Sequence, residues 1–246
     1  CMQTWKKFLP ECEVVLLDYS NLEEWLGKDV YDEILFRDFS LPKQADAIRC
    51  ALLKKYGGLW LDADTILTSP QVKDYLMIDS ELVMISKHLA FIKANNNSKI
   101  IADWYNQIQY NLKFYKDVKY QNNAVQKILH PRRYRRVENW DYLGNYILHK
   151  MLKTKNKKKF FSIDRMEINA LPELNNKNND NLVENYQNFY FENDYSQDVI
   201  KNTEGIILLH NSWTPQQFLE MNEEEFLSRN NTLSNVLKKV LSMEKF

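Results

Sequence analysis

Residues 44–64 read QADAIRCALLKKYGGLWLDAD, and this stretch decides the fold. Apolar side chains recur at helical spacing and predict a helix over about residues 43–56, after an extended stretch ending at Pro42, with one core-facing stripe: Ala45, Ile48, Ala51 and Leu52. Gly57 and Gly58 stop this helix, because glycine adopts the left-handed cap conformation at little cost. The apolar residues 59–61 then predict a buried strand that ends at Asp62-Ala63-Asp64.

The rest of the chain alternates helical and short apolar patterns. Strands are predicted over 13–18, 81–86 and 205–209. Helices are predicted over 21–26, 98–115, 122–129 and 142–152, from Thr214-Pro215 onward, and after Thr232, where Leu233, Val236, Leu237, Val240 and Leu241 form an apolar stripe. Residues 175–181 are rich in asparagine and predict a surface loop. This alternation indicates one α/β domain over 1–246, with a sheet covered by helices on both faces.

Two carboxylates at the end of a strand suggest a metal site. If residues 62–64 continue the extended strand, Asp62 and Asp64 point to the same side. Two close carboxylates repel each other unless a cation lies between them. Oxygen ligands suit Mg²⁺ or Mn²⁺, which commonly share their coordination with substrate phosphates. The alternative is an acidic turn on a solvated surface.

Two further groups carry candidate chemistry. Asp46 and Arg49 are three residues apart and share one helix face, either as an exposed ion pair or as contacts to a phosphate and a sugar hydroxyl. The second group follows the apolar residues 205–209 and comprises His210, Asn211, Ser212 and Trp213. A neutral imidazole can complete a metal site, amide and hydroxyl groups can bind phosphate, and the indole can cover the site. The alternative is a capped turn with a core tryptophan.

Taken together, these motifs resemble a glycosyltransferase family. Asp-x-x-Arg, then Tyr-Gly-Gly-x-Trp-Leu-Asp-x-Asp over residues 46–64, is similar to the sugar-binding core of the DXD-containing capsular polysaccharide synthesis proteins and related family 32 transferases. The resemblance includes His210-Asn211-Ser212-Trp213, and it implies a GT-A, Rossmann-like mixed sheet. It also implies retaining transfer of a hexose from a nucleotide sugar, often a UDP-sugar, with Mn²⁺ or Mg²⁺.

The resemblance also implies roles for individual residues. Asp46 and Arg49 would contact the sugar and phosphate side of the donor, and Asp62 would contact the ribose or sugar, with the metal through water. Asp64 and His210 would be metal ligands. The remaining residues would touch the donor diphosphate and its glycosidic oxygen: Ser212 and Trp213, with Asn211 beside them. No carboxylate nucleophile is evident, so the leaving phosphate would help to deprotonate the acceptor hydroxyl.

Relatives usually carry an N-terminal strand that helps to hold uracil and ribose. That region is absent upstream of residues 5–10, so either the sequence is truncated at its N-terminus or the nucleotide pocket is incomplete. We expect weak donor binding if residues 1–246 are the whole chain.

Composition narrows the partners. The formal net charge is zero over 246 residues, so no global field attracts nucleic acid. Three cysteines form no disulfide framework, and no apolar run is long enough to span a bilayer, which favours a cytoplasmic protein. Two basic clusters, Arg132, Arg133, Arg135 and Arg136, and Lys150, Lys153, Lys155, Lys157, Lys158 and Lys159, are either solvated surface or contacts to an anionic inner membrane face or a lipid-linked acceptor.

Two rival functions remain open from the residues alone. Phosphohydrolases of the haloacid dehalogenase type also place Asp-x-Asp after an apolar strand, but that scheme leaves Asp46, Arg49 and His210 without a role. A non-catalytic carbohydrate-binding module would use the 14 Tyr and 6 Trp rings and would not depend on metal.

Overall fold

The main sheet of the computed structural model has four strands in the order β1 (Gly58–Leu61), β4 (Phe91–Ala94), β3 (Leu82–Ile85) and β5 (Phe160–Ile163). Strands β3 and β4 are antiparallel, with Leu82 opposite Ala94. The structure describes residues 1–30, 39–86, 88–121, 124–129, 131, 139–153, 159–176 and 180–242. A mixed sheet flanked by helices confirms the predicted α/β class and is consistent with a GT-A-like fold.

The chain divides into two units, and each is described by itself. The sheet unit comprises Leu16–Trp60 and Asp79–Ser162, and the ribbon unit comprises Cys1–Val15, Leu61–Ile78 and Ile163–Phe246. A single glycosyltransferase domain over 1–246 and a surface loop over 175–181 stay predictions, and residues 177–179 lie outside the described residues.

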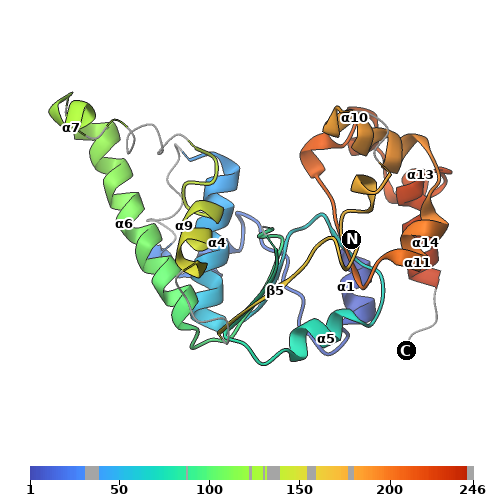
Figure 1. The fold of residues 1–246 in the computed structure, drawn as a ribbon, viewed down its shortest axis with the longest axis horizontal. Coiled ribbons are helices and arrows are strands. Elements are labelled where there is room, and N and C mark those ends of the chain that lie inside the picture. The colour runs from blue at the N-terminus through green and yellow to red at the C-terminus, as the bar shows by residue number, and fades with distance from the viewer. Residues whose placement is uncertain are drawn as a thin grey trace. The chain divides into compact units, whose positions relative to one another are not determined.

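Helices of the sheet unit pack around one apolar core. They are α2 (Leu22–Leu26), α4 (Leu41–Tyr56), α6 (Lys99–Gln121), α7 (Ala124–Leu129) and α9 (Asn145–Leu152). Figure 1 shows α4, α6 and α9 side by side, and α6 packs against both of the others. Trp104 of α6 is fully buried, and its indole N–H donates to the carbonyl of Leu143 over 2.9 Å. This bond fixes the approach to α9.

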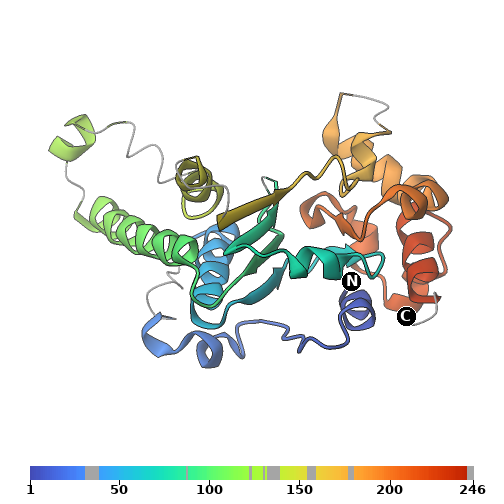
Figure 2. The same cartoon turned by 60° about the horizontal axis from the view of Figure 1, so that its bottom comes forward.

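The ribbon unit is built on a two-stranded antiparallel ribbon of β2 (Thr65–Leu67) and β6 (Ile206–Leu208). Its helices are α1 (Met2–Phe8), α5 (Val72–Met77), α10 (Leu182–Gln187), α11 (Ser196–Asn202), α12 (Gln216–Leu219), α13 (Glu223–Leu227) and α14 (Thr232–Ser242) (Figure 2). The shorter turns are η2 (Pro172–Leu174), the π-helical η3 (Asn188–Glu192) and η4 (Asn211–Trp213). Helix α14 packs against α1, α11 and η3, and Leu233, Val236 and Val240 of its apolar stripe are buried.

Several sequence predictions need correction. Residues 13–18 are coil and not a strand, and Leu16 is 53% exposed. Helix α4 begins at Leu41, so Pro42 belongs to its first turn, where the missing N–H costs nothing. Strand β1 is half-buried instead of buried. The other predicted strands and helices are present with shifted ends, except that residues 122 and 123 lie outside the described residues.

The glycine stop is confirmed. Gly57 caps α4 at φ 68°, its N–H donates to the carbonyl of Leu53, and an added Cβ would meet the backbone of Asn96 at 2.6 Å. A side chain at this position would therefore both strain the cap and collide with backbone.

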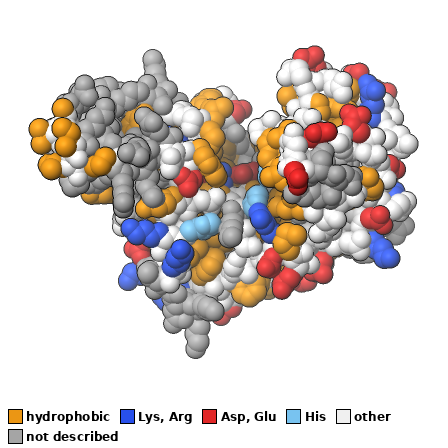
Figure 3. Space-filling view, turned by 45° about the horizontal axis from the view of Figure 1, so that its top comes forward, with side chains coloured by type: hydrophobic (Ala, Val, Ile, Leu, Met, Phe, Trp, Pro, Cys, Tyr) orange, Lys and Arg blue, Asp and Glu red, His pale blue; other side chains and the backbone are white. Residues whose placement is uncertain are grey.

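Charged surface residues are scattered over the face that Figure 3 shows. Lys150, Lys153 and Lys159 are exposed, and Lys159 pairs with Glu81 at 2.8 Å. The other predicted basic residues lie outside the described residues: Arg132, Arg133, Arg135, Arg136, Lys155, Lys157 and Lys158. Within the part of the chain that the structure describes, no helix is both long and apolar enough to span a bilayer.

Candidate functional site

The Asp-Ala-Asp motif forms a turn between two strands. Strand β1 ends at Leu61, β2 begins at Thr65, and the N–H of Thr65 donates to the carbonyl of Asp62 over 2.9 Å. The motif therefore follows a strand, as predicted, but it is not extended. The expectation that alternation along a strand aims Asp62 and Asp64 to one side is wrong in its premise, because the chain has already turned.

Strand pairing brings two distant motifs together. In the β2–β6 ribbon, Thr65 lies opposite Leu208, so the residue before β2 and the residues after β6 share one end. At that end the backbone N–H of Asn211 donates to Oδ2 of Asp64 over 3.0 Å, across 147 residues of sequence. A hydrogen bond to a carboxylate is stronger than a neutral one. We call Asp64 and His210–Trp213 the acidic corner.

Helix α1 fixes the strand that follows the turn. The indole N–H of Trp5 donates to the carbonyl of Thr65 over 2.8 Å, and the N–H of Leu67 donates to the hydroxyl of Thr4 over 3.1 Å. Both bonds are buried and satisfy backbone groups on the edge of a two-stranded ribbon. The position of Asp64 therefore depends on α1 as well as on β6.

Aromatic rings support the other half of the corner. The ring of His210 lies 4.2 Å from that of Trp213, and both contact Tyr186 of α10 edge-on, at 5.7 and 5.5 Å. The hydroxyl of Tyr186 accepts from the N–H of His210 over 3.2 Å, and Gln187 donates to the carbonyl of Trp213 over 3.0 Å. Trp213 is half-buried on this aromatic base, whereas Asn211 and Ser212 are exposed.

Burial, with a smaller contribution from the charge of Arg165, lowers the pKa of His210 below its usual value. The imidazole is therefore neutral at pH 7, which is the form that binds a metal or accepts a hydrogen bond.

The donor set of the acidic corner suits a divalent cation that takes most of its ligands from a substrate. Among the described residues, no group of three or more His, Cys, Asp or Glu is arranged to hold a metal ion by itself. A carboxylate accepts at about four positions, so the bond from Asn211 is compatible with coordination by Asp64. Mg²⁺ commonly binds through one or two carboxylates and substrate phosphates. Asp64 offers one such carboxylate, whereas the described structure does not bring Asp62, Asp64 and His210 together as a three-ligand set.

Asp46 and Arg49 lie in the sheet unit and form a buried pair. Their exposed fractions are 4% and 6%, and Nε of Arg49 lies 3.7 Å from Oδ1 of Asp46. Arg49 also donates from Nη1 to the carbonyl of Leu89 over 2.6 Å and stacks over Trp60 at 5.2 Å. The alternative of an exposed ion pair is therefore wrong.

The buried pair also changes the picture of helix α4. Its buried face includes Asp46, Ala47 and Cys50, whereas Ala45 and Ile48 are only half-buried. A Cβ on Gly144, the N-cap residue of α9, would collide with the carboxylate of Asp46. Only glycine at position 144 leaves room for this carboxylate.

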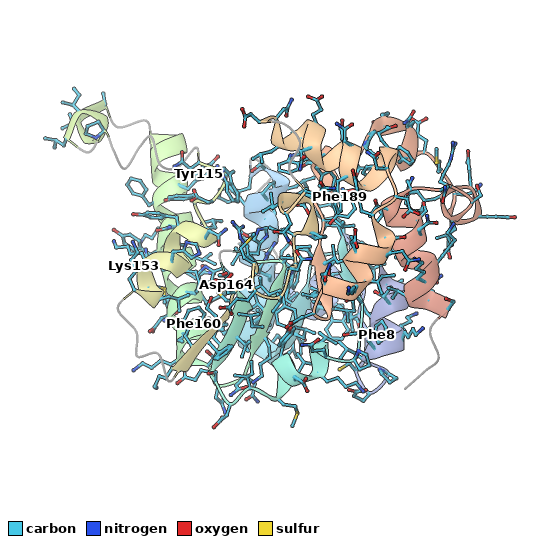
Figure 4. All side chains as sticks on the ribbon, turned by 45° about the vertical axis from the view of Figure 1, so that its right-hand side comes forward. Phe8, Tyr115, Lys153, Phe160, Asp164 and Phe189 are labelled. Carbon is cyan, nitrogen blue, oxygen red and sulfur yellow. The ribbon has the colours of Figure 1, made fainter. Side chains whose placement is uncertain are left out.

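Sequence reasoning missed the support of the corner. The supporting residues lie in short elements with no motif: Tyr186, Tyr190 and Glu173. Phe189 lies in the π-helix η3 beside Tyr190, is labelled in Figure 4 and stacks on Tyr195. The one available signal was the aromatic density of residues 186–191, YQNFYF, which indicated a core segment but not its neighbour.

The fold and the corner together describe an α/β protein with an acidic turn beside a His-Asn-Ser-Trp loop. The model of the capsular polysaccharide synthesis protein family matches residues 1–226. The chain belongs to this family, and the membership suggests a glycosyltransferase role. No curated protein and no solved structure matches the chain.

Proposed function

We propose that the chain is a metal-dependent retaining glycosyltransferase that moves a hexose from a UDP-sugar to a saccharide or lipid-linked saccharide. Family membership supports the reaction class. The observation that carries the proposal is the 3.0 Å bond from the backbone of Asn211 to Asp64, which joins the two predicted halves of a diphosphate site.

Each residue of the corner has a role suited to its exposure. Asp64, with Asp62 and His210, would hold Mn²⁺ or Mg²⁺, and such a cation stabilises a departing diphosphate by neutralising its charge. Asn211 and Ser212 are exposed and can donate to phosphate oxygens. Trp213 is held by Tyr186 and can exclude water from the donor.

The proposed reaction at the acceptor uses no nucleophile from the protein. We assign no nucleophile, so the leaving phosphate oxygen takes the proton of the acceptor hydroxyl while the new glycosidic bond forms on the same face. Asp46 and Arg49 are proposed to contact the donor sugar and phosphate side, and this role rests on the family resemblance. Action at the cytoplasmic face of the cell membrane is likewise part of the proposal.

A donor-hydrolysis screen tests the function. UDP- and GDP-sugars are incubated with Mn²⁺ and the wild-type protein, Asp64→Ala, or the control Asp74→Ala, which removes an exposed carboxylate of α5 in the same unit. We expect release of free sugar by the wild type and the control, at least ~100-fold slower release by Asp64→Ala, and loss of activity with chelator.

Two results would contradict the proposal. Hydrolysis of generic phosphate esters without dependence on a sugar nucleotide would indicate a phosphohydrolase. Glycan binding unchanged by chelator and by Asp64→Asn, with no turnover of any donor, would indicate a carbohydrate-binding module.

A further inference from the structure

Glu173 is a buried carboxyl group one layer behind the acidic corner. It lies in η2, is 2% exposed, and its Oε2 accepts from the hydroxyl of Tyr190 over 3.1 Å. Its Oε1 is buried and has no hydrogen-bond partner among the residues that the structure describes. An ionised carboxylate so enclosed is costly, because burial penalises the charged form and one oxygen lacks a donor.

A continuous set of contacts links Glu173 to the corner. The ring of Tyr190 lies 4.8 Å from that of Tyr186, which contacts both His210 and Trp213 edge-on. The side chain of Asn185 donates to the backbone carbonyl of Glu173 over 2.9 Å and ties η2 to α10. Disordering of η2 would therefore weaken the packing of Tyr186 against His210 and Trp213.

Tyr186 and Tyr190 lie on either side of a change from α-helix to π-helix. Helix α10 continues directly into η3 (Asn188–Glu192), whose wider turn stands where a single regular helix would otherwise continue. Single π-turns are rare and are frequent at functional sites. Tyr186 of α10 and Tyr190 of η3 are both fully buried, and their ring centroids are 4.8 Å apart.

We propose that Glu173 is a positioning residue that, in its neutral form, holds the His210–Trp213 loop through Tyr190 and Tyr186. The residue touches neither donor nor acceptor in this scheme. Its relevance to catalysis rests on the proposed function, whereas its control of the loop does not.

The surroundings of Glu173 set the pH range over which its carboxyl group ionises. Burial raises its pKa to about 7, and the backbone, Tyr190 and the charge of Arg165 oppose that rise. The other titratable groups on this chain of contacts are Tyr186, Tyr190 and His210. Burial raises the pKa of each phenol above its usual value, so both tyrosines stay neutral, and burial lowers the pKa of His210 below its usual value. Loop order should therefore fall as the pH rises through about 7.

Three variants separate this role from a general structural one. Glu173→Gln keeps the shape and an acceptor for Tyr190 but cannot ionise. Tyr190→Phe removes the hydroxyl that Glu173 binds. Glu184→Gln, an exposed carboxylate of α10, is the matched control.

The readout is acrylamide quenching of Trp213, measured from pH 5.5 to 8 as the difference between each protein and its Trp213→Phe counterpart. We expect at least a two-fold rise in quenching with a midpoint near pH 7 in the wild type and in Glu184→Gln. Glu173→Gln should show low quenching at every pH, and Tyr190→Phe should show high quenching already at pH 6. A wild-type transition retained in Glu173→Gln, or Tyr190→Phe indistinguishable from the wild type, would overturn the proposal.

Donor hydrolysis by the same variants is measured separately. If no variant hydrolyses any donor but the quenching transition follows Glu173, the proposed function fails and the positioning role stands. If hydrolysis depends on Asp64 while quenching ignores Glu173, the function stands and the positioning role fails.

Discussion

The acidic corner and the buried pair of Asp46 and Arg49 were both predicted to bind the donor, but they differ in burial. Asn211 and Ser212 of the corner are exposed, and Asp64 is half-buried. Asp46 and Arg49 are almost fully buried, and Arg49 also binds the carbonyl of Leu89 and stacks on Trp60. An aspartate of each group was predicted to serve the donor, but Asp64 lies partly in solvent whereas Asp46 lies in the protein interior.

This difference separates effects on activity from effects on stability. Polar groups that face solvent can be exchanged for neutral ones at little cost in folding stability. Substitutions in the acidic corner should therefore change ligand binding more than the free energy of unfolding. A buried charge whose partner is removed must be desolvated alone, so changes in the pair should affect folding.

The largest effect is expected for Arg49→Met. Loss of the guanidinium leaves the carboxylate of Asp46 buried and leaves the carbonyl of Leu89 without this donor. We expect a loss of about 3–5 kcal/mol in unfolding free energy, measured by urea denaturation. The control, Lys113→Met, removes an exposed cation of α6 and should change the value by less than about 0.5 kcal/mol. Equal stability of the two variants would erase the contrast between pair and corner.

A smaller effect is expected from the pH dependence of Glu173. Because its pKa in the folded protein is raised to about 7 from 4.5, it contributes stability that is fully present below pH 4.5 and is lost as the pH rises through 7. This contribution is on the order of 3 kcal/mol. Denaturation from pH 4.5 to 7.5 should show a decline that is absent in Glu173→Gln and retained in Glu184→Gln. A parallel decline in all three proteins would refute this assignment.

Gly144→Ala tests how closely the pair is enclosed. The added methyl group collides with the carboxylate of Asp46, and overpacking of this kind costs about 1–3 kcal/mol. In an Asp46→Ala background the same change should cost far less, because the colliding atoms are gone. Additive costs in the double variant would show that the two positions do not interact.

Trp5→Phe should give the smallest change in unfolding free energy, and it tests whether α1 holds the strand that follows Asp64. It removes the indole donor to the carbonyl of Thr65 and leaves a buried acceptor, at a cost of about 1–2 kcal/mol. The exposed Trp140→Phe is the control, at 63% exposure. If both variants unfold at the same urea concentration, α1 does not fix β2.

Much of the fold could be predicted, because long apolar periodicities such as those of α6 and α14 are decided locally. The strand expected over 13–18 is coil, because within the described part of the chain these residues pair with no strand of either sheet. Strands β2, β4 and β5 were missed because three- or four-residue strands take their identity from the partner they pair with.

The candidate site divides in the same way. Asp64 and His210–Trp213 could be named from local motifs, but not the 3.0 Å bond that joins them, since it depends on pairing between β2 and β6. Burial of Asp46 and Arg49 was missed because a three-residue spacing reads equally well as a solvated face. Glu173 carried no pattern, and only packing identifies it.

Calorimetric titration of UDP with Mn²⁺ into the wild type, Asp64→Ala and Asp74→Ala tests the central claim most directly. Binding that requires Mn²⁺, weakens at least ~30-fold in Asp64→Ala and is unchanged in Asp74→Ala is the predicted result, because Asp64 lies against the His-Asn-Ser-Trp loop whereas Asp74 lies in α5. Nucleotide binding of equal strength in all three proteins, with or without Mn²⁺, would contradict a metal–diphosphate site at the acidic corner.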